Sequence, residues 1–179
     1  MNQKTQSTPR PNLYLIGFMG TGKSVVGQLA AKMLGLSFLD SDLEIEKKYK
    51  TSVSEIFKIH GEIGFREMER NFILSGHPKS GCLVSCGGGL PIGEGMIEML
   101  KSNGKVFTLW ASPKTIFERT KKNSSRPLLQ TEDPFSKITE LLSEREVKYR
   151  KADKIISTDV RSVSEVAALI QKNYLEELN

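Results

Sequence analysis

Cysteine is scarce in this chain of 179 residues, which has two cysteines, two histidines and one tryptophan. If Cys82 and Cys86 lie in one strand, their spacing spans about 13 Å, whereas a disulfide needs Cα atoms within about 7 Å. The further Cys or His ligands that a metal site would need are missing nearby. We therefore expect two buried, reduced side chains in a protein from a reducing compartment.

Long apolar runs are also missing. No stretch reaches about 18 apolar residues, and the polar start at 1–12 lacks the apolar region of a secretory signal. We therefore expect a cytoplasmic protein with no membrane partner. The composition, 38% hydrophobic and 26% charged, is ordinary for a globular chain. A chain of this size can bury roughly 70% of its unfolded surface, so we expect a single domain over 1–179.

Charge of one sign is not concentrated anywhere in the sequence. The formal net charge is +5 and the pI is about 9.2, which suits nucleic acid, anionic lipid or a small anionic substrate equally well. Lys and Arg alternate with Asp and Glu, whereas a nucleic-acid footprint gathers them on one face with aromatic residues. We therefore expect no nucleic-acid partner. The alternative from another functional class is a nucleotide-gated binding module that associates with nucleic acid.

Short apolar runs alternate with helix-like segments along the chain. Strands are predicted at 13–16, 37–39, 82–86, 106–110 and 154–157. Apolar spacing near 3.6 predicts helices at 24–35, 40–60 with a break at Gly61 and continuation to 75, 114–120, 135–150 and 163–178. This alternation predicts an α/β fold with three layers, α/β/α, in which helices cover both faces of a central parallel sheet of about five strands.

The most specific motif is Gly17-Phe18-Met19-Gly20-Thr21-Gly22-Lys23-Ser24, which matches G-x-x-x-x-G-K-S/T. It follows an apolar strand and opens a helix, as a phosphate-binding loop requires. Lys23 is expected to reach the β- and γ-phosphates and Ser24 to ligate Mg²⁺. The residues expected to bind nucleotide here are Gly20, Thr21, Gly22, Lys23, Ser24 and Val25. The structural alternative is a glycine-rich turn whose Lys and Ser are incidental.

Two carboxylates, Asp40 and Asp42, directly follow the strand predicted at 37–39. Loops at the carboxyl ends of parallel strands line the ligand crevice, so we expect both carboxylates near the phosphate site. One can hold Mg²⁺, directly or through water, and the other can orient an acceptor hydroxyl. Either residue could also cap the helix that follows.

Further motifs then follow in order: Gly61-Glu62 with Phe65-Arg66 and Glu69, Gly87-Gly88-Gly89, Arg126-Pro127-Leu128-Leu129, and Arg145 with Tyr149 and Ala152. Together with the phosphate loop and Asp40-Ser41-Asp42, this set resembles the shikimate kinase family over about 13–178. The resemblance implies a P-loop NTPase of the nucleoside-monophosphate-kinase fold. It implies an enzyme that uses ATP and Mg²⁺ to phosphorylate the 3-hydroxyl of shikimate, within the pathway to chorismate and the aromatic amino acids.

The resemblance also implies a division of the chain. A core holds the phosphate loop at 17–24, and a helical segment at about 40–75 binds the substrate. A lid lies at about 121–134, and an adenine loop lies at about 158–163. Family members are commonly monomers, so we expect a monomer.

Roles for single residues follow from the resemblance. Arg66 and Arg145 match the positions that bind the carboxylate of shikimate, and the planar guanidinium suits that group. Asp42 matches the residue that binds the ring hydroxyls and orients the one to be phosphorylated. The substrate also contacts the glycines Gly87, Gly88 and Gly89. Arg126 matches a lid arginine over the phosphates, so Lys23, Asp42 and Arg126 are the expected catalytic residues.

The nucleotide and metal contacts are implied in the same way. Arg119 aligns with an arginine near the adenine, and Arg161 falls in the adenine loop. Ser85 lacks the carboxylate that ends an ordinary Walker B strand. Mg²⁺ is therefore expected on Ser24, ATP oxygens and water, with Asp40 acting through the water. Cys86 stands where Thr is frequent in the family.

Plainer interpretations remain open for several of these residues. Arg66 could simply pair with Glu62 one turn away, whereas Arg145 has no acidic residue three or four positions away. The glycine triplet could be only a tight turn. Among enzymes, the alternatives are a gluconate kinase, against which the arginines and the triplet argue, and a nucleoside monophosphate kinase, for which no second set of base contacts is found.

Overall fold

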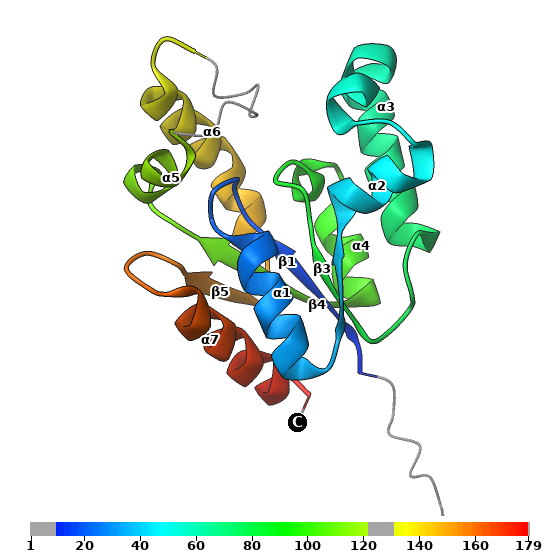
Figure 1. The fold of residues 1–179 in the computed structure, drawn as a ribbon, viewed down its shortest axis with the longest axis vertical. Coiled ribbons are helices and arrows are strands. Elements are labelled where there is room, and N and C mark those ends of the chain that lie inside the picture. Colours follow the sequence, from blue (N-terminus) through cyan, green and yellow to red (C-terminus); the bar gives the residue numbers. More distant parts are fainter. Residues whose placement is uncertain (1–9, 122–130, 179) are drawn as a thin grey trace, which may run out of the picture.

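The computed structural model describes residues 10–121 and 131–178. Within these ranges a parallel five-stranded sheet has the order β2-β3-β1-β4-β5 (Figure 1). Its strands are β1 (Asn12–Ile16), β2 (Ser37–Asp40), β3 (Cys82–Ser85), β4 (Gly104–Trp110) and β5 (Lys154–Ser157). The predicted α/β class with a central parallel sheet is therefore confirmed.

Helices cover both faces of this sheet (Figure 1). They are α1 (Lys23–Leu34), α2 (Ser41–Tyr49), α3 (Val53–Ser75), α4 (Met96–Asn103), α5 (Pro113–Thr120), α6 (Pro134–Tyr149) and α7 (Val163–Glu176), with a short 3-10 helix at Leu90–Ile92. None of the helices in the described ranges combines the length and the apolar character that crossing a bilayer requires.

The central strand β1 shows how one segment supplies two cores. Successive side chains of a strand point to opposite faces. Leu13 and Leu15 accordingly pack with α1 and α7, whereas Tyr14 and Ile16 pack with α3, α4 and α6. All four side chains are fully buried, as expected for a parallel strand covered on both sides.

Two boundaries differ from the sequence prediction. The helix predicted over 40–60 is in fact two, because Lys50 adopts a left-handed conformation (φ 54°) that ends α2. Ser52 then caps α3 by accepting a hydrogen bond from the Glu55 N–H at 3.2 Å. The predicted break at Gly61 is confirmed, since its φ of 66° interrupts α3.

Two further differences concern β3 and the segment after it. The strand predicted at 82–86 ends at Ser85, so Cys86 lies just beyond it. Cys82 and Cys86 are buried and not disulfide-bonded, as expected. The 3-10 helix and α4 fill a segment for which the sequence predicts no regular structure.

The parallel sheet brings distant segments to one edge. The phosphate loop leaves β1, Asp40 ends β2, the glycine triplet follows β3 and Thr158 follows β5. Because all five described strands run the same way, these segments share the carboxyl edge, where open α/β sheets bind ligands. The fold therefore assembles the predicted site residues from separate parts of the chain.

Candidate active site

The loop between β1 and α1 has the geometry of an anion cradle. Gly20 and Gly22 have φ values of 78° and 92°, a conformation that side-chain-bearing residues rarely adopt. Gly22 is the N-cap of α1 and supplies no side chain to cap its first turn. The first backbone N–H groups of α1 and the positive end of its dipole therefore face the loop.

Lys23 is buried beside this loop and opens α1. Its Nζ donates hydrogen bonds to the carbonyl oxygens of Gly17 at 2.8 Å and Phe18 at 3.0 Å. A buried ammonium held by carbonyl oxygens places a full positive charge at the phosphate-binding loop. Lys23 is thus where the motif predicts it, with its charge at the cradle.

Ser24, Asp40 and Ser85 form an oxygen cluster at the ends of three elements. Ser24 Oγ donates to Asp40 Oδ2 at 2.8 Å and lies 3.4 Å from Ser85 Oγ. Asp40 also caps α2, since its Oδ1 accepts the Asp42 N–H at 3.2 Å. Asp40 therefore caps α2 and also belongs to the oxygen cluster with Ser24 and Ser85.

This cluster fits the ligand preference of Mg²⁺, which is for hard oxygen atoms. In the described residues no group of three or more His, Cys, Asp and Glu side chains converges as a metal site. A magnesium ion at Ser24 would therefore take most of its ligands from phosphate oxygens and water, as this ion does in kinases.

Asp42, on the first turn of α2, lies against the glycine triplet. A Cβ atom at Gly87 would sit 2.5 Å from Asp42 Oδ1, so a side chain at this position would displace the Asp42 carboxylate. Gly87 N–H also donates to Ser41 Oγ at 2.9 Å. Burial raises the pKa of Asp42, as does the nearby charge of Asp40, while Lys23 opposes the shift.

Arg66 lies at the other end of the triplet. Its guanidinium contacts Glu62 Oε1 at 2.8 Å and Glu69 Oε2 at 2.6 Å. A Cβ atom at Gly89 would collide with the same guanidinium. The ion pair with Glu62 is therefore confirmed. Arg66 also lies against Gly89 of the glycine triplet.

Glu69 forms an ion pair with Arg66 that the sequence analysis does not predict. The sequence analysis names Glu69 only as part of a motif. Its side chain is 2% exposed, and burial raises its pKa to about 7 although Arg66 opposes the shift. Because the sequence places Glu62 and Glu69 at similar distances from Arg66, only packing distinguishes the buried partner from the exposed one.

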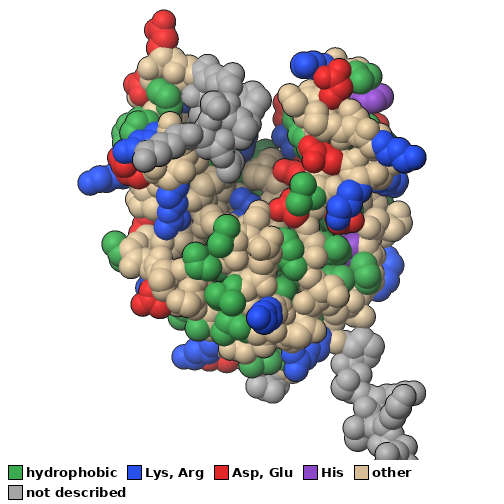
Figure 2. Space-filling model, in the orientation of Figure 1, with side chains coloured by type: hydrophobic (Ala, Val, Ile, Leu, Met, Phe, Trp, Pro, Cys, Tyr) green, Lys and Arg blue, Asp and Glu red, His purple; other side chains and the backbone are tan. Residues whose placement is uncertain are grey.

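Arg145 approaches the triplet from α6. Its guanidinium carbon lies 5.5 Å from the centre of the Phe18 ring, and Nη1 lies 3.5 Å from the Gly88 carbonyl oxygen. Arg66 and Arg145 line the same cavity, which has a volume of about 710 Å³. In Figure 2 the surface is hollowed between α3 and α6. The structure therefore brings together the two arginines that sequence analysis pairs.

The family model described as shikimate kinase matches residues 19–175 of this chain. The chain belongs to the shikimate kinase family. A shikimate kinase of Thermodesulfovibrio yellowstonii is 45% identical to it over 163 residues, which cover 91% of this chain and 94% of that protein. A shikimate kinase of Cupriavidus pinatubonensis is 42% identical over 164 residues, covering 91% of this chain and 85% of the relative.

Solved structures of the family are also similar to this fold. A shikimate kinase from Acinetobacter baumannii in complex with shikimate has a TM-score of 0.86 and 36% identity, with 94% of each chain covered. The shikimate kinase of Aquifex aeolicus has a TM-score of 0.77 and 32% identity, covering 93% of this chain and 97% of that one. The predicted P-loop kinase fold and membership of the family are thus confirmed.

Of the residues outside the phosphate-loop motif that the family resemblance assigns to nucleotide, Arg119 contacts this loop. Arg119 on α5 donates to the Gly20 carbonyl oxygen at 3.3 Å and to Thr158 Oγ1 at 2.9 Å, so it links the phosphate loop to the loop after β5. Arg161 is exposed and donates to the Ser157 carbonyl oxygen at 3.0 Å. Val25 is exposed on the first turn of α1.

One predicted catalytic residue falls outside the described part of the chain. Arg126, with most of the lid predicted at about 121–134, lies in 122–130. Its role stays a prediction.

Thr21 is buried and donates to the Phe18 carbonyl oxygen at 2.8 Å, which stabilises the turn of the phosphate loop.

Proposed function

We propose that this chain transfers the γ-phosphoryl group of ATP to the 3-hydroxyl of shikimate, giving shikimate 3-phosphate and ADP. The observation that carries the proposal is the glycine triplet, which contacts Asp42 at Gly87 and Arg66 at Gly89. A carboxylate that can orient a hydroxyl and a guanidinium that can bind an acid thus lie at two ends of one short segment. This arrangement suits a small hydroxy acid such as shikimate.

The two arginines would bind the acid end of the acceptor. Arg66 and Arg145 come from different helices and line one cavity, so they can approach a carboxylate from two sides. Glu69 keeps the Arg66 guanidinium in place through its 2.6 Å contact. Hydrogen bonds between charged groups are stronger than neutral ones, which favours an anionic acceptor over a neutral polyol.

Asp42 would orient the acceptor hydroxyl and receive its proton. The hydroxyl oxygen forms a bond to the γ-phosphorus as the bond from that phosphorus to the bridging oxygen of ADP breaks. Burial raises the pKa of Asp42 and so makes its carboxylate a better proton acceptor than an exposed aspartate. The proton therefore moves from the acceptor hydroxyl to Asp42.

Lys23 would stabilise the charge on the phosphates during transfer. Its ammonium lies at the phosphate loop, and phosphoryl transfer depends mainly on positioning and charge neutralisation. Ser24 would supply one ligand to Mg²⁺, which neutralises phosphate charge when bound, and Asp40 would hold a water of the ion. Arg119 and Arg161 would contact the adenine end of ATP, and Arg126 would contact its phosphates.

We also propose that the protein works as a cytoplasmic monomer without nucleic-acid or membrane partners. Its two cysteines are buried and free, which is compatible with a reducing compartment. Gel filtration with light scattering tests the monomer, and a higher mass at micromolar concentration would contradict it. Retention on heparin resin until high salt would instead favour a nucleic-acid-binding module.

A coupled assay of ADP formation over shikimate, quinate, gluconate and AMP tests the proposed reaction. We expect turnover with shikimate. Shikimate methyl ester is the matched control, since it keeps the ring hydroxyls and loses the negative charge. Its kcat/KM should fall by about 100-fold, which corresponds to one or two charge-assisted hydrogen bonds. Turnover with AMP or gluconate alone would contradict the proposal.

A further inference from the structure

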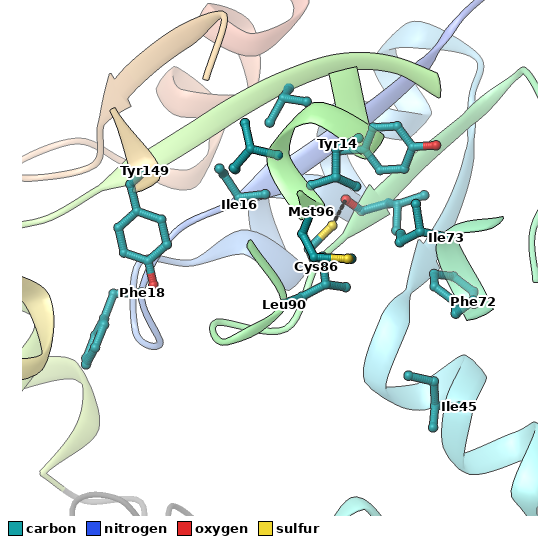
Figure 3. Close-up of a cluster of buried hydrophobic side chains, with 14 of the residues drawn as sticks. Tyr14, Ile16, Phe18, Ile45, Phe72, Ile73, Cys86, Leu90, Met96 and Tyr149 are labelled. Atoms are coloured by element: carbon teal, nitrogen blue, oxygen red, sulfur yellow. Dashed lines mark hydrogen bonds between the residues drawn. The ribbon is translucent and has the colours of Figure 1, made fainter. Parts of the chain in front are cut away.

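Tyr149 ends α6, four residues after Arg145, and links three parts of the molecule. Its side chain is fully buried. The hydroxyl donates a hydrogen bond to the Gly88 carbonyl oxygen at 2.9 Å, and the Tyr149 carbonyl oxygen accepts one from Thr108 Oγ1 at 2.6 Å. Figure 3 shows the Tyr149 hydroxyl pointing toward the ring of Phe18. Tyr149 therefore ties α6 both to β4 and to the glycine triplet.

The same hydroxyl also lies beside Arg145. Burial raises the pKa of Tyr149 to about 12, although the positive charge of Arg145 opposes the shift. The phenol is thus protonated at any ordinary assay pH, so it can donate to the Gly88 carbonyl oxygen. Arg145 Nη1 in turn lies 3.5 Å from the Gly88 oxygen. Hydroxyl, guanidinium and carbonyl form one small group.

The orientation of the Gly88 carbonyl has a consequence for the next residue. The peptide bonds of the described residues are all trans, and a trans peptide is planar with its C=O and N–H pointing in opposite directions. Because the Gly88 C=O points to the buried Tyr149, the N–H of Gly89 points away from it. A residue without a side chain has little else to hold its peptide plane in one orientation.

We propose that Tyr149 is a positioning residue of the acceptor pocket, whose hydroxyl fixes the Gly88 peptide and the Arg145 guanidinium relative to each other. The inference rests on the proposed phosphorylation of shikimate. Tyr149 acts through Gly88 and Arg145 and touches no reacting atom. Its loss should therefore weaken binding of the acid and leave the phosphate loop and the chemical step largely as they are.

The test is Tyr149→Phe, which removes one oxygen and keeps the buried ring. The KM for shikimate should rise about tenfold, the factor that corresponds to one ordinary buried hydrogen bond. The KM for ATP and kcat should both stay within about twofold of the unchanged protein. The substitution weakens binding of the acceptor equally in the ground state and in the transition state, so only the KM for shikimate changes. Both KM values are measured in the ADP-coupled assay.

Tyr174→Phe is the matched control. Tyr174 is also fully buried, and its hydroxyl donates to the Pro11 carbonyl oxygen at 2.5 Å. It packs with α1 and α7 on the opposite face of the sheet from Tyr149. Its replacement removes a buried hydrogen bond of the same kind, so it should lower the melting temperature in a similar way without changing the KM for shikimate.

The outcomes separate this inference from the proposed function. A rise in the KM for shikimate with Tyr149→Phe alone supports the positioning role. An unchanged KM for shikimate, or equal rises in both KM values, overturns it while the proposed function stands. Equal effects of the two substitutions overturn it as well, since they would reflect stability only. If the unchanged protein does not turn over shikimate, the proposed function and this inference fail together.

Discussion

Ser24 Oγ donates a hydrogen bond to Asp40 Oδ2 over 2.8 Å, and this contact joins the first turn of α1 to the end of β2. The other oxygen of Asp40 accepts the Asp42 N–H at 3.2 Å. One carboxylate therefore orients the hydroxyl expected to bind Mg²⁺ and also stabilises the helix that carries Asp42. These two effects can be separated by substitution.

Asp40→Asn should raise the Mg²⁺ concentration needed for half-maximal activity and leave the melting temperature nearly unchanged. Asparagine caps helices as well as aspartate does but has no negative charge. Asp40→Ala should show the same defect and also lose about 1 kcal/mol of stability, because the cap is gone. Magnesium titrations and thermal unfolding measure both effects. An unchanged magnesium requirement in both variants would contradict a role near the metal.

Lys23→Ala should reduce kcat by at least about 100-fold, since it removes a charge that stabilises the transferring phosphoryl group. The fold should persist, as checked by circular dichroism. Lys32→Ala is the control, because Lys32 is an exposed lysine in the last turn of the same helix. Activity near that of the control would show that Lys23 is not catalytic.

Asp42→Asn should lower kcat more than it raises the KM for shikimate. The amide keeps a polar contact with the hydroxyl but does not accept its proton. Glu44→Gln, in the same helix turn, removes a carboxylate that pairs with exposed Lys47 at 2.6 Å, and it should be close to normal. If Asp42→Asn raised KM with kcat unchanged, Asp42 would be a binding residue without a part in the chemical step.

The raised pKa of Glu69 predicts that the stability of the protein depends on pH. That pKa rises from 4.5 to about 7 on folding, so the folded protein holds the proton more tightly than the unfolded chain does. The free energy of unfolding should therefore fall between pH 4.5 and pH 7, by on the order of 1–3 kcal/mol. Glu69→Gln should flatten this slope in urea unfolding measured across the range.

Glu62→Gln is the control for that experiment. It removes the other carboxylate partner of Arg66, whose side chain is 68% exposed where that of Glu69 is 2% exposed. An exposed ion pair contributes little to stability, about 0–1 kcal/mol. The slope of this variant should match that of the unchanged protein. Equal slopes for Glu69→Gln and the unchanged protein would show that Glu69 does not carry the effect.

The sequence predicted the sheet, the phosphate loop and the position of Asp40 near that loop, because parallel strands bring their carboxyl ends together. It did not predict α4, which has only eight residues. Its N-cap, Gly95, supplies no capping side chain to mark the start, as Ser112 does for the equally short α5, and a helix this short depends on packing, here of Met96, Ile97 and Leu100 in the core. The break between α2 and α3 was missed because Lys50, and no glycine or proline, takes the left-handed conformation.

Contacts between side chains were harder to predict than positions. Tyr149 and Gly88 are 61 residues apart in the chain, and their hydrogen bond depends on how α6 packs on the sheet. Sequence analysis paired Arg66 with Glu62 alone, and only tertiary packing identifies Glu69 as its buried partner. Local patterns thus located the residues, whereas long-range packing determined their partners.

The glycine triplet also sets a length scale for the acceptor. Asp42 lies at its first residue and Arg66 at its third. The triplet forms a turn, since the Leu90 N–H donates to the Gly87 carbonyl oxygen at 3.0 Å, so the two ends are closer than the roughly 7 Å that two extended residues span. The groups that would hold the acid and the hydroxyl of an acceptor therefore approach the same short segment of backbone. We therefore expect the site to prefer a compact acceptor, whose acid group and reactive hydroxyl lie close together, over an open-chain sugar acid whose reactive hydroxyl lies at the far end.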